Sequence, residues 1–131
     1  MRLYPPGWSF GRKALRDDQI GGYDIPAGSL VWVCPYVTHR HPAFWDRAEE
    51  FDPERFTPEA AKSRSRFAYF PFSSGPRMCI GSQFAMMVAQ LALASILGRY
   101  RLLLPDGVRV EPEAALSLRP RGPVPMLLDP V

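Results

Sequence analysis

Apolar residues occur along this chain in short runs separated by turn-forming residues. From Arg12 to Val37 the pattern is strand-like, and the glycine pair Gly21-Gly22 interrupts it. This arrangement predicts a hairpin, because glycine accepts the positive φ angles of tight turns. Residues 29–34 are rich in β-branched and aromatic side chains, and they predict a buried strand.

The clearest helical pattern lies just after residue 81. Residues with three- and four-residue spacing define one helix face: Phe84, Met87, Val88, Leu91, Ala94 and Ser95. Gly98 follows as a terminator, so the predicted helix covers residues 82–97. Gln90 interrupts the apolar stretch, which is also shorter than the ~20 residues of a membrane span. We therefore expect a buried helix.

The other elements are expected to be short. Residues 38–60 contain several prolines and predict helical turns and loops. Residues 61–78 predict a long irregular stretch, and such stretches are often functional. Toward the C-terminus we expect strands at residues 101–104, 116–118 and 126–128, with a turn at residues 105–107. The predicted fold class is α+β, with an N-terminal antiparallel sheet portion, an irregular middle, one long helix and a small terminal sheet.

Composition limits the classes of function. The chain has 131 residues, of which 47% are hydrophobic, enough for a packed core in one domain or in one piece of a larger one. Its net charge of +3 is too small to indicate a nucleic-acid partner. The two cysteines form no disulfide framework, and no apolar leader follows Met1, so we expect a cytoplasmic location.

Residues 72–81 carry the candidate chemistry. Cys79 precedes the predicted helix, where the helix dipole and unpaired N–H groups favour a thiolate, the metal-binding form. Gly75 permits a positive φ, Gly81 permits the close approach of a flat ligand, and Arg77 offers a cation to an acidic group of that ligand. One cysteine supplies only one metal bond, which suits a metal already held by a macrocycle.

The residues alone leave other interpretations of Cys79 open. It is also compatible with a buried structural cysteine, or with a nucleophile for which His39 and His41 are the available bases. We interpret both histidines as structural hydrogen-bonding residues. Cys34 lies in a predicted strand, and we interpret it as structural too.

The spacing Phe72-x-x-Gly75-x-Arg77-x-Cys79-x-Gly81 resembles the cysteine-ligand signature of the cytochrome P450 family. Because the pattern fixes five positions within ten residues, the signal is specific. The resemblance implies a haem cofactor, with Cys79 as the axial thiolate on the haem iron.

Four further segments resemble the family in the same order. Residues 2–6 resemble the end of its Glu-x-x-Arg helix, and residues 12–28 resemble the β-hairpin that follows. Residues 51–56 resemble its PERF segment, and residues 116–120 resemble its last hairpin. The resemblance therefore spans nearly the whole chain and corresponds to roughly the last third of a family member, so we treat residues 1–131 as a partial cytochrome P450 domain.

The resemblance also implies a role for each matching residue. Arg77 and Arg12 would pair with haem propionates, and Phe72 would pack beside the cysteine. The predicted haem contacts are Phe72, Gly75, Arg77, Cys79, Gly81 and Arg12. Arg2 and Arg55 would belong to a buried Glu-Arg-Arg network. The predicted substrate-lining residues are Gly7, Trp8, Ser9, Ala115 and Leu116.

The implied activity is that of an oxidoreductase, a haem-thiolate monooxygenase. The intact parent would insert one oxygen atom from O₂ into a small apolar organic substrate, with electrons from NAD(P)H delivered by a reductase or a ferredoxin. The cofactor would perform most of the chemistry, and the protein would supply the ligand and the orientation.

The sequence departs from the family pattern at its start. The glutamate of Glu-x-x-Arg would stand three residues before Arg2, so we expect Arg2 and Arg55 to lack their carboxylate. The helix that carries the acidic residue and the threonine used in oxygen activation is also absent. We therefore expect a fragment that is marginally stable and inactive alone. The alternatives are a non-catalytic haem-binding module and an interaction remnant that binds no haem.

Overall fold

A computed structural model describes residues 1–131, and it divides into two compact units. The first unit covers residues 1–71 and the second covers residues 72–131. The division falls immediately before Phe72, the first residue of the cysteine signature. We call residues 72–81 the cysteine loop.

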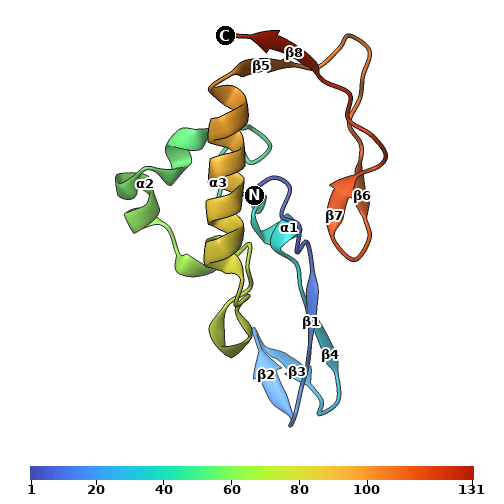
Figure 1. The fold of residues 1–131 in the computed structure, drawn as a ribbon. Coiled ribbons are helices and arrows are strands. Elements are labelled where there is room, and N and C mark those ends of the chain that lie inside the picture. Colours follow the sequence, from blue (N-terminus) through green and yellow to red (C-terminus); the bar gives the residue numbers. More distant parts are fainter. The chain divides into compact units, whose positions relative to one another are not determined.

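Two antiparallel strand pairs form the sheet portion of the first unit (Figure 1). Its strands are β1 (Phe10–Lys13), β2 (Asp18–Ile20), β3 (Tyr23–Ile25) and β4 (Leu30–Val33). β1 pairs with β4, so that Phe10 lies opposite Val33, and β2 pairs with β3. The turn between β2 and β3 is at Gly21 and Gly22, whose φ angles are +59° and +87°. The predicted hairpin is confirmed.

The prediction of a buried strand at residues 29–34 was wrong about burial. Leu30 and Trp32 in β4 are 58% and 64% exposed, and they alternate with half-buried residues. β4 pairs only with β1, so one face of its pleat stays open. The strand-like pattern also ends early, because Pro35 occupies the first turn of helix α1 (Pro35–Thr38).

Short helical turns make up the rest of the first unit. They are the 3₁₀ turn η1 (Pro53–Phe56), helix α2 (Pro58–Ser63) and the 3₁₀ turn η2 (Arg66–Ala68). Each begins after a side chain that accepts a backbone N–H bond, namely Asp52, Thr57 and Ser65. These caps explain why a segment with so many prolines still folds into defined turns.

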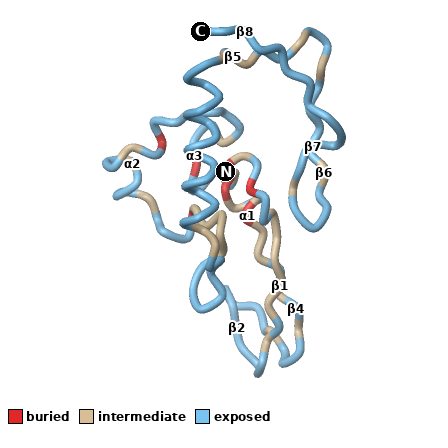
Figure 2. Tube along the Cα trace, viewed as in Figure 1, coloured by how far each residue is buried: buried red, intermediate tan, exposed pale blue.

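The core of the first unit is small and aromatic. Trp45, Ala68 and His39 are buried, and red patches mark the buried positions in Figure 2. The Trp45 indole N–H donates to the Ala68 carbonyl at 3.2 Å. Phe56 and Tyr69 pack against each other and against the Trp45 ring, with centroids 5.0 to 6.3 Å apart.

The second unit contains the long helix and the C-terminal strands. Its elements are the 3₁₀ turn η3 (Gly75–Arg77), helix α3 (Ser82–Leu97), and strands β5 (Tyr100–Leu103), β6 (Pro112–Ala114), β7 (Leu118–Pro120) and β8 (Leu127–Pro130). β5 pairs with β8 and β6 pairs with β7, both antiparallel. The predicted helix is confirmed with its bounds. Gly98 ends it without a positive φ, and a Cβ there would lie 2.9 Å from the Ala94 carbonyl oxygen.

The expectation that this helix is buried was wrong. No residue of α3 is buried, and the helix is pale blue or tan in Figure 2. Apolar side chains surround most of its circumference instead of forming one stripe, and Met86, Leu93 and Ile96 lie outside the predicted face. No helix of this structure is both long enough and apolar enough to cross a membrane.

The predicted strand at residues 116–118 was misplaced. Leu116 is fully exposed, and Ala115 N–H donates to the Ser117 carbonyl across a tight bend. The pairing of Ala114 with Leu118 leaves these three residues as the loop of the β6–β7 hairpin. The strand β7 therefore begins at Leu118.

Candidate functional site

The cysteine loop is folded by two backbone bends. Ser73 and Gly75 have φ angles of +66° and +72°, so the chain reverses within a few residues. Cys79 N–H then donates to the Phe72 carbonyl at 2.9 Å, and Met78 N–H donates to the Gly75 carbonyl at 3.0 Å. The first bond joins the residue that opens the loop to the candidate ligand.

Cys79 lies at the start of α3, two residues before its N-cap, Gly81. The Cys79 carbonyl accepts a hydrogen bond from Ser82 N–H at 3.3 Å, and its side chain is exposed. A Cβ added at Gly81 would lie 3.9 Å from the Cys79 Sγ, which is ordinary van der Waals contact. Contacts within the chain therefore do not require glycine at position 81. A flat ligand lying close over the sulfur would require it.

The Cys79 side chain is exposed, so one of the interpretations made from the sequence, that of a buried structural cysteine, is excluded. Each histidine accepts a backbone hydrogen bond within the first unit: the His39 Nε2 accepts Phe70 N–H, and the His41 Nδ1 accepts Ala43 N–H. Both histidines are thus structural hydrogen-bonding residues, as predicted. The structure contains no group of three or more His, Cys, Asp or Glu side chains that could hold a metal ion.

The predicted contact residues fall into both units. Phe72, Gly75, Arg77, Cys79 and Gly81 are together in the cysteine loop of the second unit, where the Arg77 side chain is exposed. Arg12 belongs to β1 of the first unit, and its guanidinium lies 4.7 Å from the centre of the Phe10 ring. The predicted substrate-lining residues are divided in the same way: Gly7, Trp8 and Ser9 precede β1, and Ala115 and Leu116 lie in the β6–β7 loop.

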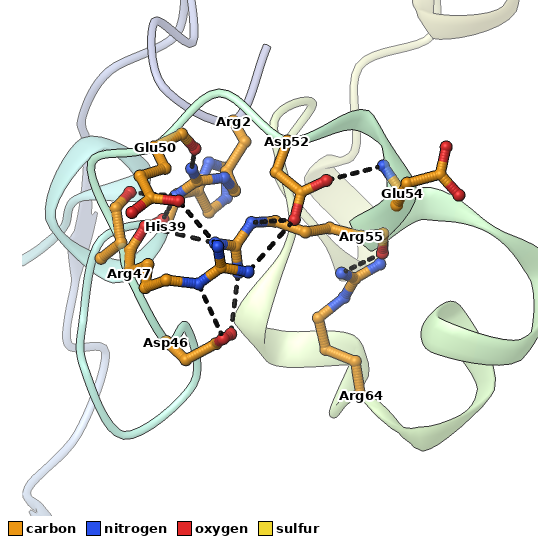
Figure 3. A network of polar contacts seen from close by, with 10 residues as sticks. Arg2, His39, Asp46, Arg47, Glu50, Asp52, Glu54, Arg55 and Arg64 are labelled. Atoms are coloured by element: carbon orange, nitrogen blue, oxygen red, sulfur yellow. Dashed lines mark hydrogen bonds and ion pairs between the residues drawn. The ribbon is translucent and has the colours of Figure 1, made fainter.

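Arg2 is anchored in the first unit although it is the second residue of the chain. Only 5% of its surface is exposed, and its guanidinium donates to the carbonyls of His39, Ala48 and Glu50 (Figure 3). Its charge also lies 5.0 Å from the centre of the Trp45 ring. Burial, followed by repulsion from the neighbouring arginines, lowers the pKa of Arg2.

Arg55 is buried beside this anchor and has carboxylate partners. Its Nη1 lies 2.8 Å from Asp46 and its Nε lies 3.6 Å from Asp52, while Nη2 donates to the Arg47 carbonyl (Figure 3). Two aspartates, Asp46 and Asp52, pair with Arg55 where the family's glutamate was expected to be missing. The hydrogen bond from Arg55 lowers the pKa of Asp46. Sequence reasoning gave neither aspartate a role, although Asp52 lies within the PERF segment.

Arg64 extends the same cluster. It donates to the Arg55 carbonyl at 2.9 Å, and its guanidinium faces the rings of Trp45 and Phe56 at 4.6 and 4.9 Å. No motif position predicted these contacts. They show that an arginine in an irregular stretch can be part of a core.

His39 joins the arginine cluster to the chain that enters the cysteine loop. Its carbonyl accepts from Arg2, and its Nε2 accepts from Phe70 N–H at 3.0 Å. The imidazole is fully buried, and Nδ1 has no hydrogen-bond partner. Desolvation lowers the pKa of His39 to about 4, so the ring is neutral at pH 7.

A family model described as cytochrome P450 matches residues 1–127 of the chain. This chain belongs to the cytochrome P450 family. The match covers both units, and so includes the cysteine loop, the PERF segment and the arginine cluster.

Individual P450 relatives match over the same length. The chain is 43% identical over 130 residues to cyclooctatin synthase of Streptomyces melanosporofaciens and 38% identical over 132 residues to thromboxane-A synthase of Sus scrofa. It is 36% identical over 132 residues to cytokinin hydroxylase of Arabidopsis thaliana. At least 99% of the chain is covered in each case, but only 25 to 28% of each relative.

The fold is also that of P450 structures. The crystal structure of the cytochrome P450DA heme domain matches with a TM-score of 0.93 and 34% sequence identity, over 99% of this chain and 29% of that one. The α+β class and the P450 fold of this chain are therefore confirmed. The chain spans little more than a quarter of the length of the P450 proteins that it matches.

Proposed function

We propose that this P450 chain forms the cysteine-ligand side of a haem-thiolate monooxygenase, with Cys79 as the axial ligand. The observation that carries the proposal is the closed cysteine loop. An exposed sulfur stands at the start of a 16-residue helix, and a backbone hydrogen bond from Cys79 to Phe72 holds it there.

The surface around the sulfur suits a flat, mostly apolar group with acidic substituents. Met78, Ile80 and Phe84 are all exposed beside Cys79 in sequence, and they offer apolar contact. The exposed Arg77 offers a cation to a propionate, and Arg12 is the second candidate for such a pair. Haem bound by the thiolate would supply O₂ activation, which electron donation from sulfur favours.

The proposed reaction is monooxygenation. One atom of O₂ is inserted into a C–H bond of an apolar organic substrate, and the other is reduced to water with two electrons and two protons. The two electrons required come from NAD(P)H through a reductase or a ferredoxin. Gly7, Trp8, Ser9, Ala115 and Leu116 are the proposed substrate-lining residues, and we propose a cytoplasmic location.

Haem titration of the purified chain tests this proposal, with Cys79→Ala and Cys34→Ala compared side by side. Cys34 is the matched control, because it is the other free cysteine and its Sγ donates to the Trp8 carbonyl. We expect the wild type and Cys34→Ala to bind haem with a thiolate-type ferric spectrum, and Cys79→Ala to lose that spectrum. Equal spectra for all three proteins would exclude Cys79 as the ligand.

Turnover separates the monooxygenase from a haem-binding module without activity. The haem-loaded chain is mixed with a reductase, NADPH and a small apolar test substrate, and hydroxylated product is measured. Product formation supports the monooxygenase. A thiolate spectrum without product supports the haem-binding module, and failure to bind any haem supports an interaction remnant.

A further inference from the structure

A pocket with a volume of about 340 Å³ lies in the first unit. All of its lining residues lie between positions 43 and 68, so it is formed by residues 1–71 alone. None of the predicted haem-contact or substrate-lining residues belongs to it. Ala43, Phe44 and Ala60 give the pocket apolar surface, and Arg64 and Ser65 give it polar surface. This size and this mixture are typical of sites for small organic molecules.

Arg64 is the cation of this pocket that lacks a carboxylate partner. It takes part in none of the ion pairs of the structure, and its hydrogen bond goes to the Arg55 carbonyl (Figure 3). The side-chain atoms that are buried without a partner belong to His39 and Arg55, so the other N–H donors of Arg64 remain open to solvent. Burial lowers the pKa of Arg64, and the charge of Arg55 lowers it further. A bound anion would oppose both effects.

The neighbouring charges favour a ligand with a single negative charge. Asp46 and Arg55 also line the pocket, and they pair with each other at 2.8 Å. Their charges offset each other, which leaves Arg64 as the uncompensated charge of the lining. A carboxylate matches this charge and also the planar shape of a guanidinium. A doubly charged phosphate would meet repulsion from Asp46.

Ser65 offers a second donor next to Arg64. Its Oγ accepts the Phe67 N–H at 3.3 Å, so the hydroxyl proton remains available to a ligand. Ser63 also lines the pocket, but its hydroxyl donates to the Ala60 carbonyl at 3.1 Å, so its proton is already used. Two adjacent residues, a guanidinium and a hydroxyl, can therefore donate to one carboxylate.

We propose that this pocket binds a small organic monocarboxylate with an apolar body. Arg64 and Ser65 donate to the carboxylate. Phe44, whose surface is 50% exposed, contacts the apolar body together with Ala43 and Ala60. The proposal does not depend on haem or on the cysteine loop, so it can fail or succeed separately from the proposed function.

Titration of the purified chain with benzoate at pH 7, followed residue by residue by NMR of the backbone amides, tests the site. Benzoate carries a carboxylate on an apolar ring, and benzamide is a neutral probe of nearly the same shape. We expect benzoate to shift the amide signals of residues 43–46 and 63–65, and to bind about tenfold or more tightly than benzamide. Equal affinity for the two probes, or shifts that do not gather at these residues, would overturn the proposal.

Two arginine variants test which cation holds the carboxylate. Arg66→Met is the matched control for Arg64→Met, because Arg66 is exposed, faces the Phe67 ring at 4.5 Å and does not line the pocket. We expect Arg64→Met to weaken benzoate binding by about tenfold or more, and Arg66→Met to stay within about twofold of the wild type. Equal affinities in the two variants would exclude Arg64 as the anchor of the ligand.

A third variant tests the pocket without removing Arg64, which also covers the Trp45 ring. Ala43 is exposed, so Ala43→Leu adds apolar volume to the pocket and leaves the core unchanged. We expect it to weaken benzoate binding by about fivefold or more, at an unchanged temperature of thermal unfolding. Unchanged affinity would contradict the proposal even if Arg64→Met fails to fold. Inorganic phosphate is the last probe, and binding tighter than that of benzoate would contradict the carboxylate class.

Discussion

At the scale of single residues, buried polar groups organise the first unit. Arg2 donates to backbone carbonyls, Arg55 donates to Asp46 and to the Arg47 carbonyl, and His39 uses one ring nitrogen to hold Phe70. Each of these groups would be costly to bury alone. The partners of the two arginines come from the connection between α1 and η1, and these contacts give that irregular stretch its defined shape.

Stability should depend on the protonation of His39. Its pKa is about 4 in the folded chain and 6.5 in the unfolded chain, which corresponds to at most about 3.5 kcal/mol at about 1.4 kcal/mol per pKa unit. Because the unfolded state binds the proton more readily, this stabilisation is complete above pH 6.5 and is lost as the pH falls toward 4. Urea unfolding across this range should show a steeper loss in the wild type than in His39→Gln. Equal slopes would show that His39 does not titrate on unfolding.

Two arginines with similar partners should differ in their contribution to stability. Arg55 is buried and bonds Asp46 and the Arg47 carbonyl, whereas Arg47 is exposed although it makes three ion pairs. We expect Arg55→Met to cost about 1–3 kcal/mol of unfolding free energy, because it removes the hydrogen bonds of a buried guanidinium. Arg47→Met should cost less than about 1 kcal/mol. A larger loss of unfolding free energy for Arg47→Met than for Arg55→Met, measured by urea unfolding, would contradict this view of the arginine cluster.

At the scale of elements, the sequence was informative wherever a local rule decides the structure. The helix at 82–97, the turn at Gly21-Gly22 and the motif at 72–81 follow from periodicity, glycine and fixed spacing. Burial could not be predicted in the same way. Trp32 and most residues of α3 are apolar, yet whether they are buried depends on contacts that no local pattern specifies.

The same limit applies to the site. The spacing of residues 72–81 predicted Cys79 as a ligand, but the bonds from Arg2 and from Phe70 to His39 join residues 37 and 31 positions apart. Asp46 looks like any surface aspartate until the structure places it 2.8 Å from Arg55. An aspartate can pair with an arginine, but nothing in the sequence indicated that the partner of Asp46 would be Arg55.

The bend of the cysteine loop should depend on glycine at 75. Its φ is +72° and a Cβ would meet nothing within 4 Å, so Gly75→Ala costs conformational energy alone, about 1 kcal/mol. Gly107, at φ +79° with equally open space, is the matched control in the turn after β5. Thermal unfolding should detect a similar loss in both variants, and only Gly75→Ala should weaken haem binding. Equal haem affinity in the two variants would show that the bend at Gly75 has no special role in haem binding.

At the scale of the whole molecule, the exposed apolar surface of α3 stands out. Such surfaces are usually covered in soluble proteins, and an uncovered one promotes association. We expect the chain to associate in a concentration-dependent manner, and Leu91→Lys to reduce this association because Leu91 is 61% exposed at the middle of the helix. Light scattering over a dilution series measures the effect. Lys substitution at exposed Leu15, in the first unit, should change little, and equal effects of the two would argue against α3 as the cause.

The central claim is that the cysteine loop holds a haem-thiolate site. The measurement that tests it most directly is the ferrous–CO difference spectrum of the purified, haem-reconstituted chain, with Cys79→Ala recorded alongside. The account predicts a red-shifted, thiolate-type band in the wild type and its loss in the variant. A folded wild-type chain that binds haem without this band, or a band that survives in Cys79→Ala, would contradict it.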